Sequence, residues 1–112
     1  MEIRSAVLNL AALAQQSRLT IFRYLVRMGP AGATPGEMIA GLEMSASTLS
    51  FHLKTLTHAG LIDADQVGRN ITYRANFEAI QSLVDYLTEN CCAGDPSQCR
   101  PTARKPVGKR GG

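Results

Sequence analysis

The sequence predicts a mainly α-helical fold with a β-hairpin wing, a winged helix-turn-helix whose order is four helices, two strands and a last helix. Three observations predict it. Apolar residues recur at helical spacing as far as residue 59 and again after residue 76. Between these segments the pattern changes to two short strands joined by a turn. Two short helices stand directly before this hairpin, which is the arrangement of that motif.

The first two helices are predicted from their apolar residues. The first is rather apolar and contains Val7, Leu8, Leu10, Ala11, Leu13 and Ala14. The second has a clearer helical stripe, formed by Leu19, Ile21, Phe22, Leu25 and Val26. Gly29-Pro30 follows that stripe and is expected to end the second helix.

Capping signals define the third and fourth helices. Thr34 can cap a third helix, and Pro35 fits its first position because a proline there has no amide hydrogen to leave unbonded. This helix is short and is expected to reach about Leu42. Ser45 can cap a fourth helix that continues to about Ala59 and is closed by Gly60.

A hairpin and a last helix complete the predicted domain. The strands are residues 61–67 and 71–75, with Gly68-Arg69-Asn70 as a three-residue link. Asn76 can cap the last helix, whose apolar stripe is Phe77, Ile80, Leu83, Val84 and Leu87. Residues 1–92 are thus the predicted winged helix-turn-helix domain, and 93–112 a flexible tail with the third cysteine and a basic end.

The fourth helix divides into two faces, which is the feature a recognition helix needs. Leu49, Leu53 and Leu56 lie at i, i+4 and i+7 and predict a core-facing seam. A different face carries Ser47, Ser50, Phe51 and Lys54. Small polar groups suit base edges in the major groove, a lysine suits phosphate, and the Phe51 ring suits a thymine methyl. A plain amphipathic helix with a solvated polar face would show the same periodicity.

Two residues near this face have alternative interpretations. His52 lies beside the leucine seam and is interpreted as a structural residue at its boundary. Arg69, at the predicted hairpin tip, is either a solvated cation or a group that enters a narrow minor groove.

Three stretches of the sequence carry a resemblance to a known family: LAQQSRLTIF at residues 13–22, STLSFHLKTL at 47–56 and AGLI at 59–62. Over about residues 5–90 the chain resembles the ArsR/SmtB repressors. The resemblance implies a homodimer held by the first and last helices that binds double-stranded, two-fold symmetric operator DNA. It favours DNA contacts from Ser47, Thr48, Ser50, Phe51, Lys54 and Arg69.

Charge and composition limit the other classes. The net charge is +3, but residues 1–99 carry seven Lys/Arg against nine Asp/Glu, and the other five Lys/Arg lie in residues 100–112. The N-terminus lacks a signal-peptide pattern and no apolar run is long enough for a membrane span, so a cytoplasmic protein without membrane association is expected. No phosphate-binding glycine loop or Cys-x-x-Cys is present, so neither an enzyme nor an organic cofactor is predicted.

The three cysteines lie within nine residues, as Cys91, Cys92 and Cys99. Soft thiolates prefer soft acceptors, and trivalent arsenic takes three sulfurs in a pyramid, so As(III) is the predicted inducer, with Sb(III) as a further candidate. Structural zinc usually takes four ligands, and Asp95 could supply the fourth. A disulfide from Cys92 to Cys99 is also geometrically easy.

Sensor sites of the resembled family differ, and only one of them fits here. Arsenic sensors with Cys-x-Cys on the third helix are not matched, because this chain has EMIAGL at residues 37–42. The zinc-type site needs a histidine on the last helix, which has Asp85 and Glu89 but none. The cysteines resemble the C-terminal site of a subset of arsenic-responsive repressors.

The hypothesis from sequence is a repressor that leaves its operator when As(III) binds at the end of the last helix and reshapes the dimer interface. The alternatives are a zinc- or thiol-redox-responsive repressor of the same fold, and a soft-metal carrier that no longer reads DNA.

Overall fold

The computed structural model describes residues 1–94, and the tail from residue 95 on lies outside the described residues. Its elements are α1 (Ile3–Leu13), α2 (Gln16–Met28), η1 (Gly29–Ala31), α3 (Pro35–Leu42), α4 (Ala46–His58), β1 (Ile62–Val67), β2 (Asn70–Ala75), α5 (Phe77–Thr88) and η2 (Cys91–Gly94). The predicted order of helices and strands is confirmed. The domain boundary predicted at residue 92 stays a prediction.

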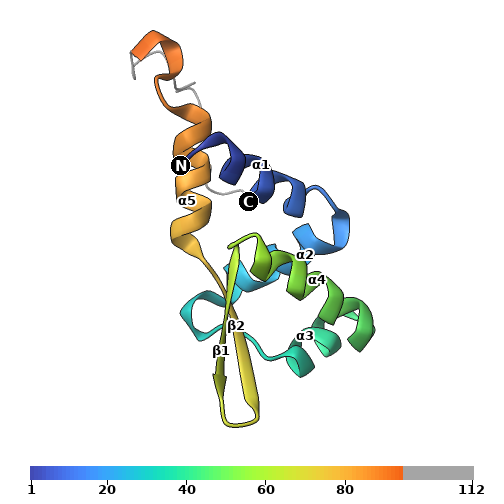
Figure 1. Ribbon diagram of the computed structural model, residues 1–112. Coiled ribbons are helices and arrows are strands. Elements are labelled where there is room, and N and C mark those ends of the chain that lie inside the picture. Colours follow the sequence, from blue (N-terminus) through green and yellow to red (C-terminus); the bar gives the residue numbers. More distant parts are fainter. Residues whose placement is uncertain (95–112) are drawn as a thin grey trace.

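The elements are arranged with α1 and α5 at one end of the molecule and the hairpin at the other (Figure 1). The helices α2, α3 and α4 lie between these ends, and α1 contacts α2, α4 and α5. Within residues 1–94, none of the helices has the length and apolar character that crossing a bilayer requires.

The predicted helix caps are confirmed by hydrogen bonds. Thr34 Oγ1 accepts from the Glu37 amide at 3.2 Å, and Glu37 Oε1 accepts from the Thr34 amide at 2.9 Å, which is a complete capping box. Ser45 Oγ accepts from the Thr48 amide at 3.2 Å, and Asn76 Oδ1 accepts from the Ala79 amide at 3.0 Å. These bonds satisfy amides that have no partner inside the helix.

The core is built around α4. Its seam residues Leu49, Leu53 and Leu56 are buried, as the periodicity predicts. They belong to one cluster with residues from α1, α2, α3 and the hairpin, which includes Ala12, Ile21, Phe22, Leu25, Met38, Leu61, Ile62 and Ala75. Burial of the seam therefore fixes which face of α4 points outward.

The hairpin differs from the prediction at its turn. Val67 pairs with Asn70, so the link has two residues, Gly68 and Arg69, and the predicted three-residue link is wrong. The reason is local: Gly68 takes φ +63°, as the first central residue of a two-residue type II′ turn requires, and Asn70 is then free to join β2.

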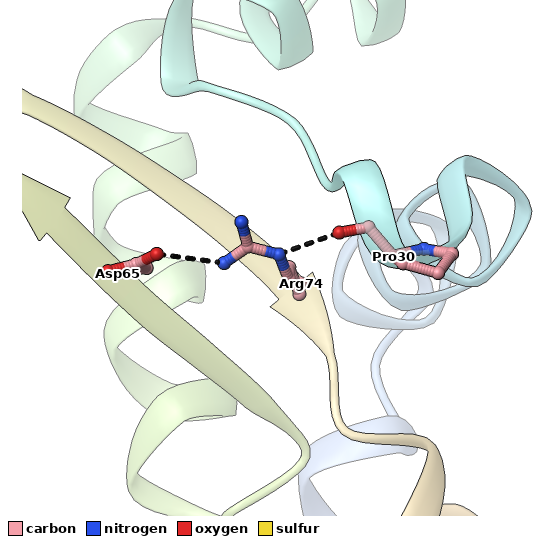
Figure 2. Close-up of polar contacts among 3 residues, drawn as sticks. All are labelled: Pro30, Asp65 and Arg74. Atoms are coloured by element: carbon pink, nitrogen blue, oxygen red, sulfur yellow. Dashed lines mark hydrogen bonds and ion pairs between the residues drawn. The ribbon is translucent and has the colours of Figure 1, made fainter.

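The wing is tied to the helical body through β2. Tyr73 and Ala33 exchange two backbone hydrogen bonds of 2.8 and 2.9 Å, which adds the segment before α3 to the edge of the sheet. Arg74 forms a second tie, because its Nε donates to the Pro30 carbonyl oxygen at 2.7 Å and its Nη1 lies 3.3 Å from Asp65 Oδ2 (Figure 2). These contacts hold the hairpin in a fixed direction.

We expect Gly32→Ala to lower the free energy of unfolding by about 1–3 kcal/mol. Gly32 has φ +66°, and an added Cβ would overlap the Tyr73 carbonyl oxygen and so push the wing away. Gly36→Ala is the control, because Gly36 is helical and its Cβ would meet open space. Urea unfolding at one protein concentration measures both. Equal stabilities for the two variants would contradict the account of the wing's anchor.

Candidate nucleic-acid interface

The exposed face of α4 carries the predicted DNA-contacting residues. Ser47, Thr48, Ser50, Phe51 and Lys54 are all exposed, while the leucine seam behind them is buried. The two faces predicted from the sequence are therefore confirmed. Hydroxyl groups at the beginning of the helix, an aromatic ring and a cation one turn later form one continuous surface.

Thr48 has a local role in addition to its position on this face. Ser45 Oγ donates to Thr48 Oγ1 at 2.9 Å while accepting from the Thr48 amide. The Thr48 hydroxyl is thus part of the N-terminal cap of α4. How this hydroxyl is presented on the exposed face of α4 therefore depends on the hydrogen bonds of the cap.

Phe51 is the most unusual residue of the face. Its side chain is 63% exposed although it is a large apolar group. Its ring meets the His52 ring edge-on, with centroids 5.4 Å apart and an interplanar angle of 63°. The contact with His52 limits where the ring can point, and the rest of the ring offers an apolar surface to a partner.

Exposed cations stand on α4, at Lys54, and on the wing, at Arg69. Among residues 1–94 the one ion pair joins Arg74 and Asp65, so Lys54 and Arg69 are not neutralised there. Arg69 is exposed and follows Gly68 in the turn at the tip of the hairpin. The wing also exposes Asp63 and Asp65, so its positive character is confined to its tip.

His52 and Arg18 form a contact behind this face that the sequence did not reveal. His52 is 8% exposed, and Arg18 Nη1 lies 3.5 Å from its Nδ1. A guanidinium only donates, so this contact is a hydrogen bond when the imidazole is neutral and Nδ1 carries no proton. Burial lowers the pKa of His52, and the charge of Arg18 lowers this pKa further. The interpretation of His52 as a structural residue at the seam fits this placement.

The cysteines lie after α5 and are only partly within the described residues. Cys91 is half-buried and begins the short 3₁₀ helix η2, which directly follows Asn90 at φ +58°. An open hollow beside it is lined by Thr88, Asn90, Cys91 and Gly94. Cys99 and Asp95 lie outside the described residues. In the part from residue 1 to 94, no three His, Cys, Asp or Glu side chains are grouped as metal ligands.

Comparisons with known proteins agree with this geometry. A family model described as a helix-turn-helix domain matches residues 13–64. The chain is 33% identical over 88 residues to YbzH of Bacillus subtilis, an uncharacterized HTH-type transcriptional regulator, and the match covers 68% of this chain and 88% of YbzH.

Two solved structures share the fold. An ArsR-like transcriptional regulator from Rhodococcus superposes with a TM-score of 0.70 at 26% identity, over 89% of each chain. A homodimeric winged helix-turn-helix DNA-binding domain, Mb0332 of Mycobacterium bovis, superposes with a TM-score of 0.63 at 23% identity, over 79% of this chain and 82% of that domain.

We expect the lowered pKa of His52 to make stability depend on pH. Because the pKa is lower in the folded state than the ordinary value of about 6.5, the unfolded chain binds more protons as the pH falls below that value. The free energy of unfolding should therefore fall from pH 7 to pH 5, and His52→Gln should reduce the slope. Urea titrations across this range measure it. An identical slope in the variant would show that His52 is not the group responsible.

Proposed function

The chain belongs to the ArsR-like family of winged helix-turn-helix transcriptional regulators, and from this premise we propose that it is a dimeric repressor that releases its operator when As(III) binds Cys91, Cys92 and Cys99. The observation that carries the DNA-binding part is the face of α4, where polar groups, Phe51 and Lys54 are exposed on a helix whose opposite side is buried. The observation that supports As(III) as the inducer is the group of three thiols within nine residues of the sequence.

In this proposal α4 enters the major groove. Ser47 and Ser50 lie where base edges would be read, and Phe51 offers an apolar surface to a thymine methyl. Lys54 contacts a phosphate, and Arg69 at the wing tip contacts the backbone or the adjacent minor groove. Thr48 contributes its hydroxyl from within the α4 cap.

A homodimer through α1 and α5 is supported by their exposed apolar side chains. On α1 these include Ile3, Val7 and Leu10, at i, i+4 and i+7, and on α5 they include Phe77, Val84 and Leu87. The two helices lie beside each other at the end of the molecule away from the wing (Figure 1). Apolar residues grouped in this way are typical of an interface, and the fold is homodimeric in Mb0332. A two-fold axis there would place the two α4 helices on one side of the dimer.

The cysteines fit trivalent arsenic by their number and chemistry. Arsenous acid and three thiols give one tris-thiolate complex and three waters, with no net release of protons. The α5 helix ends at Thr88, so Cys91 and Cys92 stand beyond it, in the short 3₁₀ helix η2. Their position directly after α5 connects the proposed site to a helix of the proposed dimer interface.

We expect Lys54→Gln to reduce the salt dependence of DNA binding. Each phosphate contact contributes about 0.9 to the slope of log K against log salt, so a dimer that loses two contacts should show a slope smaller by about 2. Arg4→Gln is the matched control, because Arg4 is an exposed cation in the first turn of α1 and belongs neither to α4 nor to the wing. Fluorescence anisotropy at several salt concentrations measures the slopes. Equal slopes for both variants would contradict the proposed phosphate contact.

We expect Cys91→Ser to bind operator DNA within about twofold of the wild type but to lose release by arsenite, since the variant lacks one sulfur of the proposed site and every residue of the α4 face remains. Thr88→Val is the control, because it changes the same hollow without removing a sulfur. Anisotropy of a labelled operator duplex during an arsenite titration measures both. Loss of DNA binding would contradict the separation of roles, and retained release would contradict the site.

A further inference from the structure

A buried amide in α1 makes a direct contact with the end of the proposed recognition helix. Asn9 is 4% exposed, and its Nδ2 donates to the Ala59 carbonyl oxygen at 2.7 Å. Ala59 is the C-cap of α4, where carbonyl groups have no partner within the helix. Ala6, Ala12 and Ala59 are also buried, and such small side chains allow the two backbones to approach closely. A buried amide with a fixed partner specifies a position as well as contributing stability.

Arg18 supplies a second connection between the same helices. Its Nε donates to the carbonyl oxygen of Ala12 at 2.7 Å, in the last turn of α1. Its Nη1 lies 3.5 Å from Nδ1 of His52, in the middle of α4. The side chain therefore bridges the end of α1 and the interior of the leucine-lined helix.

The two connections are separated along α4. His52 and Ala59 are seven positions apart, which corresponds to about 10 Å along a helix. Two contacts at this separation add to the packing of the leucine seam and restrain the angle of the α4 axis relative to α1. One starts from Asn9 in α1, and the other from Arg18 in the first turn of α2, which is hydrogen-bonded to Ala12 of α1. The helix α1 also carries the exposed apolar side chains Ile3, Val7 and Leu10.

We propose that Asn9 and Arg18 are positioning residues that fix the angle between α4 and α1, and thereby set the separation of DNA half-sites that the dimer reads. The inference rests on the proposed function as a DNA-binding dimer. Neither residue is assigned to DNA contact. They act by holding α4, the proposed recognition helix, at a fixed angle to α1, a helix of the proposed dimer interface.

The test is the dependence of binding on half-site separation. Wild-type protein is titrated with a duplex from its own upstream region and with versions lengthened or shortened by one base pair at the centre. We expect the wild type to prefer one spacing, and Asn9→Leu and Arg18→Gln each to reduce that preference at least about fivefold. Gln16→Leu is the control, because it removes an exposed amide near the same junction and should keep the wild-type preference.

The readout separates positioning from stability. A merely structural role would lower the fraction of folded protein and reduce the affinity for all spacings by one factor, which leaves their ratio unchanged. Sedimentation equilibrium confirms that each variant is a dimer at the concentrations used. Two variants are needed because Asn9→Leu buries the Ala59 carbonyl without its partner, and Arg18→Gln leaves that bond intact.

The possible outcomes separate a failure of this inference from a failure of the proposed DNA-binding function on which it rests. Wild-type protein that binds none of the duplexes would overturn the proposed function and this inference with it. A wild type with a clear spacing preference that both variants retain would overturn the positioning role alone. A reduced preference in both variants, with the control unchanged, supports the inference.

Discussion

The burial of one leucine seam determines the rest of this structure. The helix α4 has 13 residues, a length at which an isolated helix is marginal in water, so its stability and direction come from packing. Burial of a leucine side chain contributes about 1.5–3 kcal/mol, and Leu49, Leu53 and Leu56 are all buried. Once they are fixed in the core, Ser47, Ser50 and Lys54 can only face outward. The proposed DNA surface is therefore a consequence of the core.

A second constraint comes from α1, which has two faces with different partners. Ala6, Asn9 and Ala12 face the body of the molecule, and the exposed apolar side chains face away from it. A change at the proposed dimer interface would thus reach α4 through a short chain of buried contacts. Allosteric couplings are typically about 1–3 kcal/mol, which corresponds to about 5–150-fold in affinity. Such a coupling would be sufficient for a repressor that works close to its binding threshold.

The parts of the fold that depend on neighbouring residues were predictable. The caps at Thr34, Ser45 and Asn76 are local, and the seam of α4 follows from its periodicity. The three-residue link predicted for the hairpin is wrong, because a glycine at the first turn position allows a two-residue connection and leaves Asn70 to pair within β2.

The contacts of Asn9 and Arg18 were not predictable, since they join residues 50 and 34 positions apart in helices whose patterns carry no sign of the pairing. The contact of Asn9 in particular could not be predicted, because α1 is apolar on most sides and its pattern does not show which face is buried. The cysteine cluster stays a prediction, with Cys99 outside the described residues. Its interpretation depends on donor chemistry and on the resemblance.

Titration of the wild-type complex with arsenite tests the central claim most directly. The reduced protein is bound to a fluorescent duplex of its own upstream region at fixed salt, and arsenite or zinc is added. The account predicts that the anisotropy returns to the value of free DNA as arsenite occupies one site per chain, and that zinc leaves the complex intact. A complex that persists at saturating arsenite would contradict the proposed inducer, and release by zinc alone would assign the cysteines to a zinc site.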